Sequence, residues 1–84
     1  MITIINIVEK EGIKSYLIKR NLIKQYKKAK IQILAGIYGG MDLKIREPKD
    51  KGIWSFRINK QYRAFCILEG DTLIVLKIDN HQNY

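Results

Sequence analysis

Hydrophobic and polar positions follow two different periods along the chain, and the period separates helices from strands. Between residues 13 and 37 apolar residues recur every three or four positions, which is the spacing of one helical face. Elsewhere Ile, Val, Phe, Tyr and Trp gather in short runs bounded by turn-forming residues, as is typical of strands. The pattern predicts helices over residues 13–20 and 22–37, and strands over residues 3–8, 43–46, 53–59, 62–69 and 72–79.

Two short connections join the last three predicted strands. Asn59-Lys60-Gln61 and Glu69-Gly70-Asp71 are short enough to make consecutive antiparallel hairpins. Residues 1–84 show no internal repeat, linker or low-complexity segment, so they are expected to form one domain. The predicted fold class is α+β, with a two-helix hairpin packed on one face of a small, mainly antiparallel, twisted sheet of four to five strands.

Side-chain alternation in the strand over residues 53–59 separates a core face from a polar face. With a period of two, Trp54, Phe56 and Ile58 point one way, while Ser55 and Arg57 point the other. The apolar set is therefore expected in the core.

A pair of arginines is the feature of the polar face that asks for a function. The turn at residues 59–61 would set Arg57 directly opposite Arg63, and like charges there destabilise a sheet unless an anion lies between them. Lys77 shares this face, and His81 joins it if the last strand continues. Because guanidinium groups bind phosphate through paired hydrogen bonds, the cluster predicts a phosphate site.

The same alternation also puts apolar side chains on the polar face. In the last strand Ile74, Leu76 and Ile78 are expected to face the core. The odd-numbered positions then leave an apolar strip that a partner has to cover. This strip consists of Phe65, Ile67, Leu73 and Val75.

The charge balance points to an anionic partner. Sixteen Lys and Arg against eight Asp and Glu give a formal charge of +8. RNA, DNA, an anionic membrane surface and an acidic protein all fit that charge. The lysines of the second predicted helix, Lys24, Lys27, Lys28 and Lys30, are either a solvated face or a track for an RNA backbone.

Several classes of protein are excluded by composition. No stretch approaches the roughly 18 apolar residues of a membrane span. The single Cys66 has no disulfide partner, and no Cys/His cluster has zinc-ligand spacing. We therefore expect a cytoplasmic protein without a metal, a cofactor or a membrane partner.

Three segments carry a resemblance to a known family. Residues 52–58 (GIWSFRI), 62–65 (YRAF) and 71–75 (DTLIV) resemble the RelE/ParE superfamily of toxins, particularly its RelE and YoeB branch. The resemblance implies a toxin that cuts mRNA in the ribosomal A site without a metal, by attack of a ribose 2′-hydroxyl on the adjacent phosphate. It also implies a cognate acidic antitoxin protein as partner, which would cover the apolar strip of Phe65, Ile67, Leu73 and Val75.

The resemblance assigns roles to individual residues. Arg63 matches the family's catalytic arginine, Arg57 a second basic position, and His81 a C-terminal histidine that would act as the acid. The base is open between Glu47, Tyr84 and water. The expected RNA-binding residues are Lys44, Arg46, Lys49, Lys51 and Lys77.

Two other functions fit the same pattern. A ParE-like inhibitor of DNA gyrase would share the fold and would not need His81. A homologue with weakened catalysis would bind RNA or antitoxin alone, in keeping with Gln82 where family members often carry Arg or Tyr.

Overall fold

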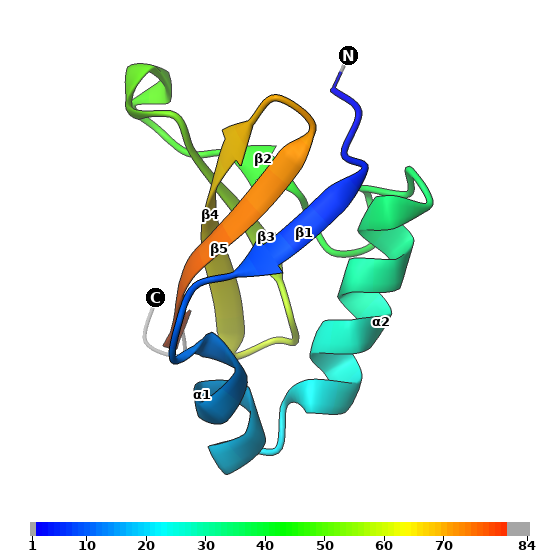
Figure 1. Cartoon of the computed structure of the whole chain (residues 1–84), viewed down its shortest axis with the longest axis vertical. Helices are drawn as coiled ribbons and strands as arrows, with labels where there is room; N and C mark the ends of the chain where they lie inside the picture. Colours follow the sequence, from blue (N-terminus) through cyan, green and yellow to red (C-terminus); the bar gives the residue numbers. More distant parts are fainter. Residues whose placement is uncertain (1, 81–84) are drawn as a thin grey trace.

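Two helices pack on one side of a five-stranded sheet in the computed structural model, which describes residues 2–80 (Figure 1). The predicted α+β class is confirmed, and the elements follow the predicted order. They are β1 (Asn6–Glu9), α1 (Ile13–Lys19), α2 (Ile23–Leu34), β2 (Lys44–Ile45), a 3-10 turn η1 (Lys49–Lys51), β3 (Ile53–Arg57), β4 (Tyr62–Glu69) and β5 (Thr72–Asn80).

The sheet places the first strand beside the last. Its order is β1-β5-β4-β3-β2, and β1 runs parallel to β5 while the other neighbours are antiparallel. β1 and β2 lie at opposite edges of the sheet, and the chain that joins them, which contains α1 and α2, crosses one face. Both helices therefore cover one face of the sheet, and we call the other face the open face.

Helix α2 is shorter than the pattern predicted, because glycine ends it. Gly36 has a φ of 81°, a left-handed conformation that costs glycine little. The amide of Ile37 donates to the carbonyl of Gln32 (2.8 Å), and the amide of Gly36 donates to Ile33 (3.0 Å). These two bonds form a Schellman motif, so the helix ends at Leu34 instead of continuing to Ile37.

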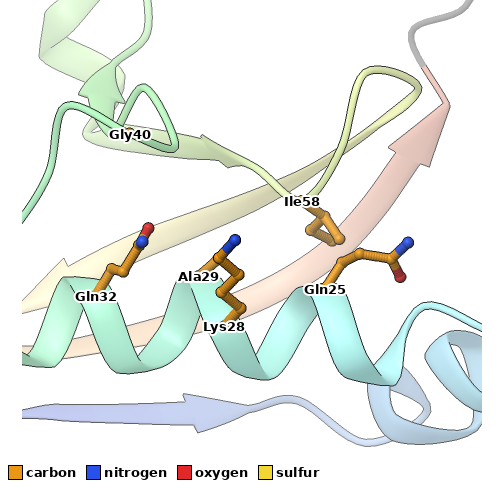
Figure 2. Close-up of a pocket in the computed structure, with 6 residues that line it drawn as sticks. All are labelled: Gln25, Lys28, Ala29, Gln32, Gly40 and Ile58. Carbon is orange, nitrogen blue, oxygen red and sulfur yellow. The ribbon is translucent and has the colours of Figure 1, made fainter.

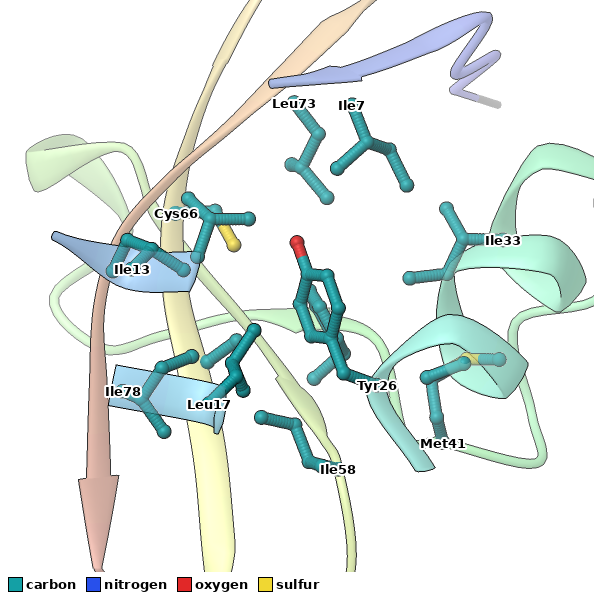
Figure 3. Close-up of a cluster of buried hydrophobic side chains, with 14 of the residues drawn as sticks. Ile7, Ile13, Leu17, Tyr26, Ile33, Met41, Ile58, Cys66, Leu73 and Ile78 are labelled. Atoms are coloured by element: carbon teal, nitrogen blue, oxygen red, sulfur yellow. The ribbon is translucent and has the colours of Figure 1, made fainter. Parts of the chain in front are cut away.

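Tyr26 of α2 lies in the middle of the hydrophobic core (Figure 3). Its hydroxyl donates a hydrogen bond to Glu9 Oε2 of β1 at 2.7 Å, and Lys30 Nζ lies 3.0 Å from the same oxygen. Burial and the neighbouring Glu9 carboxylate raise the pKa of Tyr26 far above its ordinary value. Burial also acts to raise the pKa of Glu9, but hydrogen bonds from Tyr26 and Lys30 and the charge of Lys30 outweigh it and leave that pKa lowered. A partly buried polar network thus joins α2 to the edge strand.

The pairing of β4 with β5 contains a bulge. Phe65 pairs with Lys77, whereas the next residue, Cys66, pairs with Val75, so Leu76 is an extra residue in β5. One extra residue reverses the side-chain alternation on the two sides of the bulge.

The bulge overturns part of the predicted apolar strip. Leu73 and Val75 were expected on the polar face, but both point into the core and are 0% exposed. Ile74, expected in the core, pairs with Ile67 and is only partly buried on the open face. The alternation failed here because it assumed one unbroken period along β5.

We expect Leu73→Ala to lower the free energy of unfolding by about 2–5 kcal/mol, because it opens a cavity in a packed core. Its neighbour supplies the matched control. Ile74→Ala should cost less than half as much, as measured by urea unfolding of both variants. Equal costs would contradict the bulged register.

Tyr26→Phe should lower the free energy of unfolding by about 1.5 kcal/mol, since a hydrogen bond to a charged group is lost. Tyr16 of α1, whose side chain is partly buried, supplies the control: Tyr16→Phe should lower the free energy of unfolding by less. A Tyr26→Phe variant as stable as the wild type would show that the network contributes nothing.

The same network predicts how stability depends on acid. The pKa of Glu9 is lower in the folded protein than in the unfolded chain, so its contribution to stability is fully present above the unfolded-state pKa and is lost as the pH falls through the folded-state pKa. Glu9→Gln should therefore lose less stability than the wild type between pH 5 and about pH 3. Thermal unfolding across this range measures the difference.

Candidate functional site

The open face carries the residues that the sequence singled out for chemistry. Arg57 at the end of β3 pairs with Arg63 near the start of β4, as predicted. Arg57 is exposed, whereas the side chain of Arg63 is only 14% exposed. Two guanidinium groups from neighbouring strands thus lie on the same face, and that of Arg63 packs against the protein.

Three acceptors hold Arg63 by a single nitrogen. Its Nη2 donates to the backbone carbonyl of Asp42 (3.2 Å), to Asp42 Oδ2 (3.3 Å) and to Ser55 Oγ (3.1 Å). Its Nε is buried and has no hydrogen-bond partner among residues 2–80. The guanidinium is therefore fixed through Nη2, and its buried Nε is left without a partner among residues 2–80.

Asp42 stands between two cations. Its Oδ2 lies 3.3 Å from Lys44 Nζ and 3.3 Å from Arg63 Nη2. Burial acts to raise the pKa of Asp42, but the hydrogen bond and charge of Lys44 and the charge of Arg63 lower it overall. The carboxylate stays ionised at neutral pH and offsets part of the local positive charge.

The backbone around Asp42 fixes this position. Asp42 has a φ of 55°, the left-handed conformation that Asp adopts more readily than most residues. The carbonyl of the preceding Met41 accepts a hydrogen bond from the amide of Arg57 at 2.6 Å. The loop before β2 is therefore tied to β3 beside both arginines.

The pKa of Arg63 is lower than that of an ordinary arginine. Burial lowers its pKa, the charge of Asp42 opposes that effect, and the nearby charges of Arg46 and Arg57 lower the pKa further. A guanidinium remains protonated at neutral pH despite such a shift. The site therefore holds a partly desolvated cation close to other positive charges.

An aromatic ring continues the cluster along the open face. Phe65 lies two residues beyond Arg63 on β4, opposite Ser55 on β3. The Arg46 guanidinium carbon is 5.7 Å from the ring centroid, and Lys77 Nζ is 5.5 Å from it. Cations within about 6 Å of a ring are attracted to its face. The Phe65 ring thus interacts with Arg46 and Lys77, two of the predicted RNA-binding residues, on the open face.

Other predicted site residues lie elsewhere. Glu47 follows β2, which runs antiparallel to β3, so Glu47 lies at the end of β3 opposite to Arg57. Lys49 and Lys51 belong to the 3-10 turn at that same end (Figure 1). The structure does not bring Glu47 together with the two arginines. His81 and Tyr84 lie outside the described residues.

Sequence reasoning missed Asp42 and the role of Ser55. The alternation already placed Ser55 on the face of Arg57, but a serine there carries no signal of its own. Asp42 lies in the loop after the glycines, where no period applies, and only the fold brings it to Arg63. The available clue in the sequence was that Asp42 is a single acidic residue shortly before the basic strand β2.

Four side chains form an apolar row across the other end of the open face. Val8, Ile74, Ile67 and Ile53 are consecutive cross-strand partners. Val8 is 45% exposed, and the other three are partly buried. Ile67 and Phe65 thus keep the outward position that was predicted for an antitoxin-facing surface. This apolar row replaces the strip expected from the sequence.

Residues 2–80 contain neither a candidate metal site nor a reactive thiol. Among residues 2–80 no group of three or more His, Cys, Asp or Glu side chains is placed to hold a metal ion. Burial raises the pKa of Cys66 to about 12, so its thiol stays protonated and unreactive. No helix of residues 2–80 is long and apolar enough to cross a membrane.

Comparison with known proteins gives one family and one fold. A family model described as a ParE-like toxin domain matches residues 20–84. The fold is similar to the crystal structure of a copper-bound mutant toxin from Helicobacter pylori, with a TM-score of 0.69 and 13% sequence identity over 93% of this chain and 96% of that chain. No curated protein matches the sequence. The chain therefore belongs to the ParE-like toxin domain family, within the RelE/ParE superfamily of toxins from toxin–antitoxin systems.

Proposed function

We propose that this toxin is a metal-independent mRNA endonuclease that acts on the translating ribosome in the cytoplasm. The observation that carries the proposal is the Arg57–Arg63 pair, in which one guanidinium is exposed and the other is anchored by Asp42 and Ser55. Opposed arginines without an anion between them are unfavourable, and a phosphodiester relieves that repulsion. The pair is thus suited to hold a phosphate.

The arginines would stabilise the transition state of a transesterification. The ribose 2′-hydroxyl attacks the adjacent phosphorus, the bond to the 5′-oxygen of the next nucleotide breaks, and a 2′,3′-cyclic phosphate forms. Negative charge grows on the phosphorane oxygens, where preorganised donors contribute most. Asp42 and Ser55 hold Arg63 in place, so its positive charge is already positioned beside Arg57 before a phosphate binds.

In this proposal the proton transfers are carried out by His81, by Tyr84 or by water; both residues lie outside the described range. His81 remains the predicted acid for the leaving 5′-oxygen, since an ordinary histidine pKa of about 6.5 suits that role at neutral pH. Tyr84 and water remain the predicted bases. Glu47 receives no role in this proposal, because it lies at the other end of β3.

The surroundings of the arginines support RNA as the substrate. Lys44, Arg46 and Lys77 line the open face beside the pair, and Phe65 offers an aromatic surface among them. Such cations contact phosphates without reading sequence. Lys49 and Lys51 would contact the ribosome or a more distant part of the message.

The second partner in this proposal is an acidic antitoxin. The apolar row gives such a protein a hydrophobic surface, and the charge of +8 attracts it. An antitoxin that extended from the apolar row past Phe65 to the arginine pair would block the substrate.

A gyrase inhibitor is the second candidate, because the matching family model is that of a ParE-like toxin domain. That function would use the same basic surface against a protein–DNA complex and would not need His81. A homologue that only binds RNA or antitoxin is the third.

Arg57→Gln should raise the free energy of unfolding of the isolated protein by about 0.5 kcal/mol at low salt, because it removes a like-charge pair. The gain should shrink at high salt, where charges are screened. Lys60→Gln, in the exposed turn after β3, is the control and should have a smaller effect. A destabilised Arg57→Gln would mean that the two arginines do not repel.

Arg63→Ala should slow mRNA cleavage by about 10²–10³-fold, because a donor to the transition state is lost. Arg63→Lys should recover little of the rate, since an ammonium group lacks the planar fork. Lys19→Ala, an exposed position at the end of α1, is the control and should cleave like the wild type. Primer extension on mRNA from a purified translation system gives the rates.

Supercoiling by purified DNA gyrase is the companion assay. Inhibition of supercoiling without any mRNA cleavage would replace the endonuclease by the second candidate. If neither assay responds while the protein still binds RNA or antitoxin, the third candidate holds.

A further inference from the structure

A groove runs along α2 on the side of the molecule away from the open face. Its cavity measures about 270 Å³ and lies between α2, the glycine loop that follows the helix, and the residue after β3. Figure 2 shows Gln25 at the end near Ile58 and Gln32 rising toward Gly40 at the other end. Lys28 lies between the two glutamines along the helix. Buried Ala29 and Ile58 form an apolar floor.

A second hollow extends this groove toward the start of α2. It measures about 400 Å³, shares Gln25 and Lys28 with the first, and adds Asn21 and Lys24. From Lys24 to Gln32 the helix rises about 12 Å, at 1.5 Å per residue. The two hollows together form a trough long enough for more than one unit of a polymer, and we call it the α2 groove.

The lining of the α2 groove suits an anion with hydrogen-bonding edges. None of the described residues that line it is acidic, and Lys24 and Lys28 supply positive charge. Each glutamine amide offers donors and an acceptor, as the edge of a nucleobase does. The apolar floor suits the face of a planar ring.

These polar side chains are not used by the fold. Among residues 2–80, no side-chain hydrogen bond or ion pair involves Gln25, Lys28 or Gln32, whereas Lys30 on another side of α2 is bound to Glu9. The lysines of α2 therefore divide into one that holds the core network together and others whose charge is available to a ligand.

We propose that the α2 groove binds single-stranded RNA, with a base on the apolar floor between Gln25 and Gln32 and phosphates against Lys24 and Lys28. The choice of RNA rests on the proposed function, but binding here requires no cleavage. An acidic peptide would use the two lysines and leave the amides and the floor without a matching partner. Charge and hydrogen-bonding capacity together favour the nucleic acid.

The groove and the arginine pair meet at the end of β3. Ile58 lines the groove, and Arg57 directly before it lies on the open face, about 3.8 Å away between Cα atoms. An RNA strand held by the arginines can therefore continue around this end of the sheet into the groove. The α2 groove would then hold nucleotides next to the one that is cut.

Two adjacent glycines provide a matched pair of variants. A Cβ at Gly40 would stand 3.4 Å from Gln32 Oε1, so a larger side chain there projects toward the groove, whereas a Cβ at Gly39 meets nothing within 4 Å. Neither glycine has a positive φ, so both positions accept other residues without backbone strain. Gly40→Leu should block the groove, and Gly39→Leu should leave it open.

The probe is a fluorescein-labelled ten-nucleotide 2′-O-methyl RNA, which lacks the attacking hydroxyl and cannot be cleaved. In fluorescence anisotropy Gly40→Leu should weaken binding about tenfold, which corresponds to about 1.4 kcal/mol. Gly39→Leu should bind within about twofold of the wild type. Circular dichroism checks that both variants fold.

A second measurement does not depend on Gly40→Leu folding. In Lys28→Gln the slope of log K against log salt concentration should fall by about 0.7, the value for one phosphate contact on a single strand. Lys19→Gln removes the same charge outside the groove and should leave the slope unchanged. In NMR titrations with the same RNA, the side-chain amide signals of Gln25 and Gln32 should shift.

The proposal is overturned if Gly40→Leu and Gly39→Leu bind the RNA equally well, or if the glutamine amide signals stay in place. It is also overturned if a polyglutamate peptide or the matching DNA binds more tightly than the RNA in a way that depends on position 40. If the proposed function alone fails, the groove still binds RNA but the wild type cleaves no mRNA. An intact cleavage rate with equal binding by both glycine variants refutes the groove alone.

Discussion

The pairing of the first strand with the last is the constraint on which the rest of the structure depends. Because β1 pairs with β5 at one edge and β2 lies at the other edge, the chain between β1 and β2 has to cross one face of the sheet, and that chain contains both helices. The contact from Tyr26 to Glu9, with Lys30 beside it, ties the second helix to this edge strand. The opposite face is left without helices, and the arginine pair lies there.

The open face tolerates its positive charge through a few specific contacts. Asp42 lies within 3.3 Å of both Lys44 and Arg63, and Ser55 adds a further acceptor for Arg63. These groups compensate one arginine of the pair and leave Arg57 exposed to solvent. The charge is thus lowered enough for the sheet to form and is still high enough to attract a phosphate.

The basic residues serve different purposes in different parts of the molecule. Lys30 belongs to a partly buried network that holds β1 and α2 together. Arg46 and Lys77 lie around the ring of Phe65 on the open face. Lys24 and Lys28 line the α2 groove. A formal charge of +8 therefore describes at least three separate surfaces and not one uniform field.

Features that depend only on neighbours along the chain could be predicted from the amino-acid sequence. Helical periodicity, glycine at helix ends and short turns gave the fold class, and the three-residue turn was enough to set Arg57 opposite Arg63. Tertiary structure decided the rest. The extra residue at Leu76, which turns Leu73 and Val75 into the core, satisfies packing against elements far away in sequence. Asp42 reaches Arg63 only because a loop folds back onto β3, and no local pattern contains the position of such a loop.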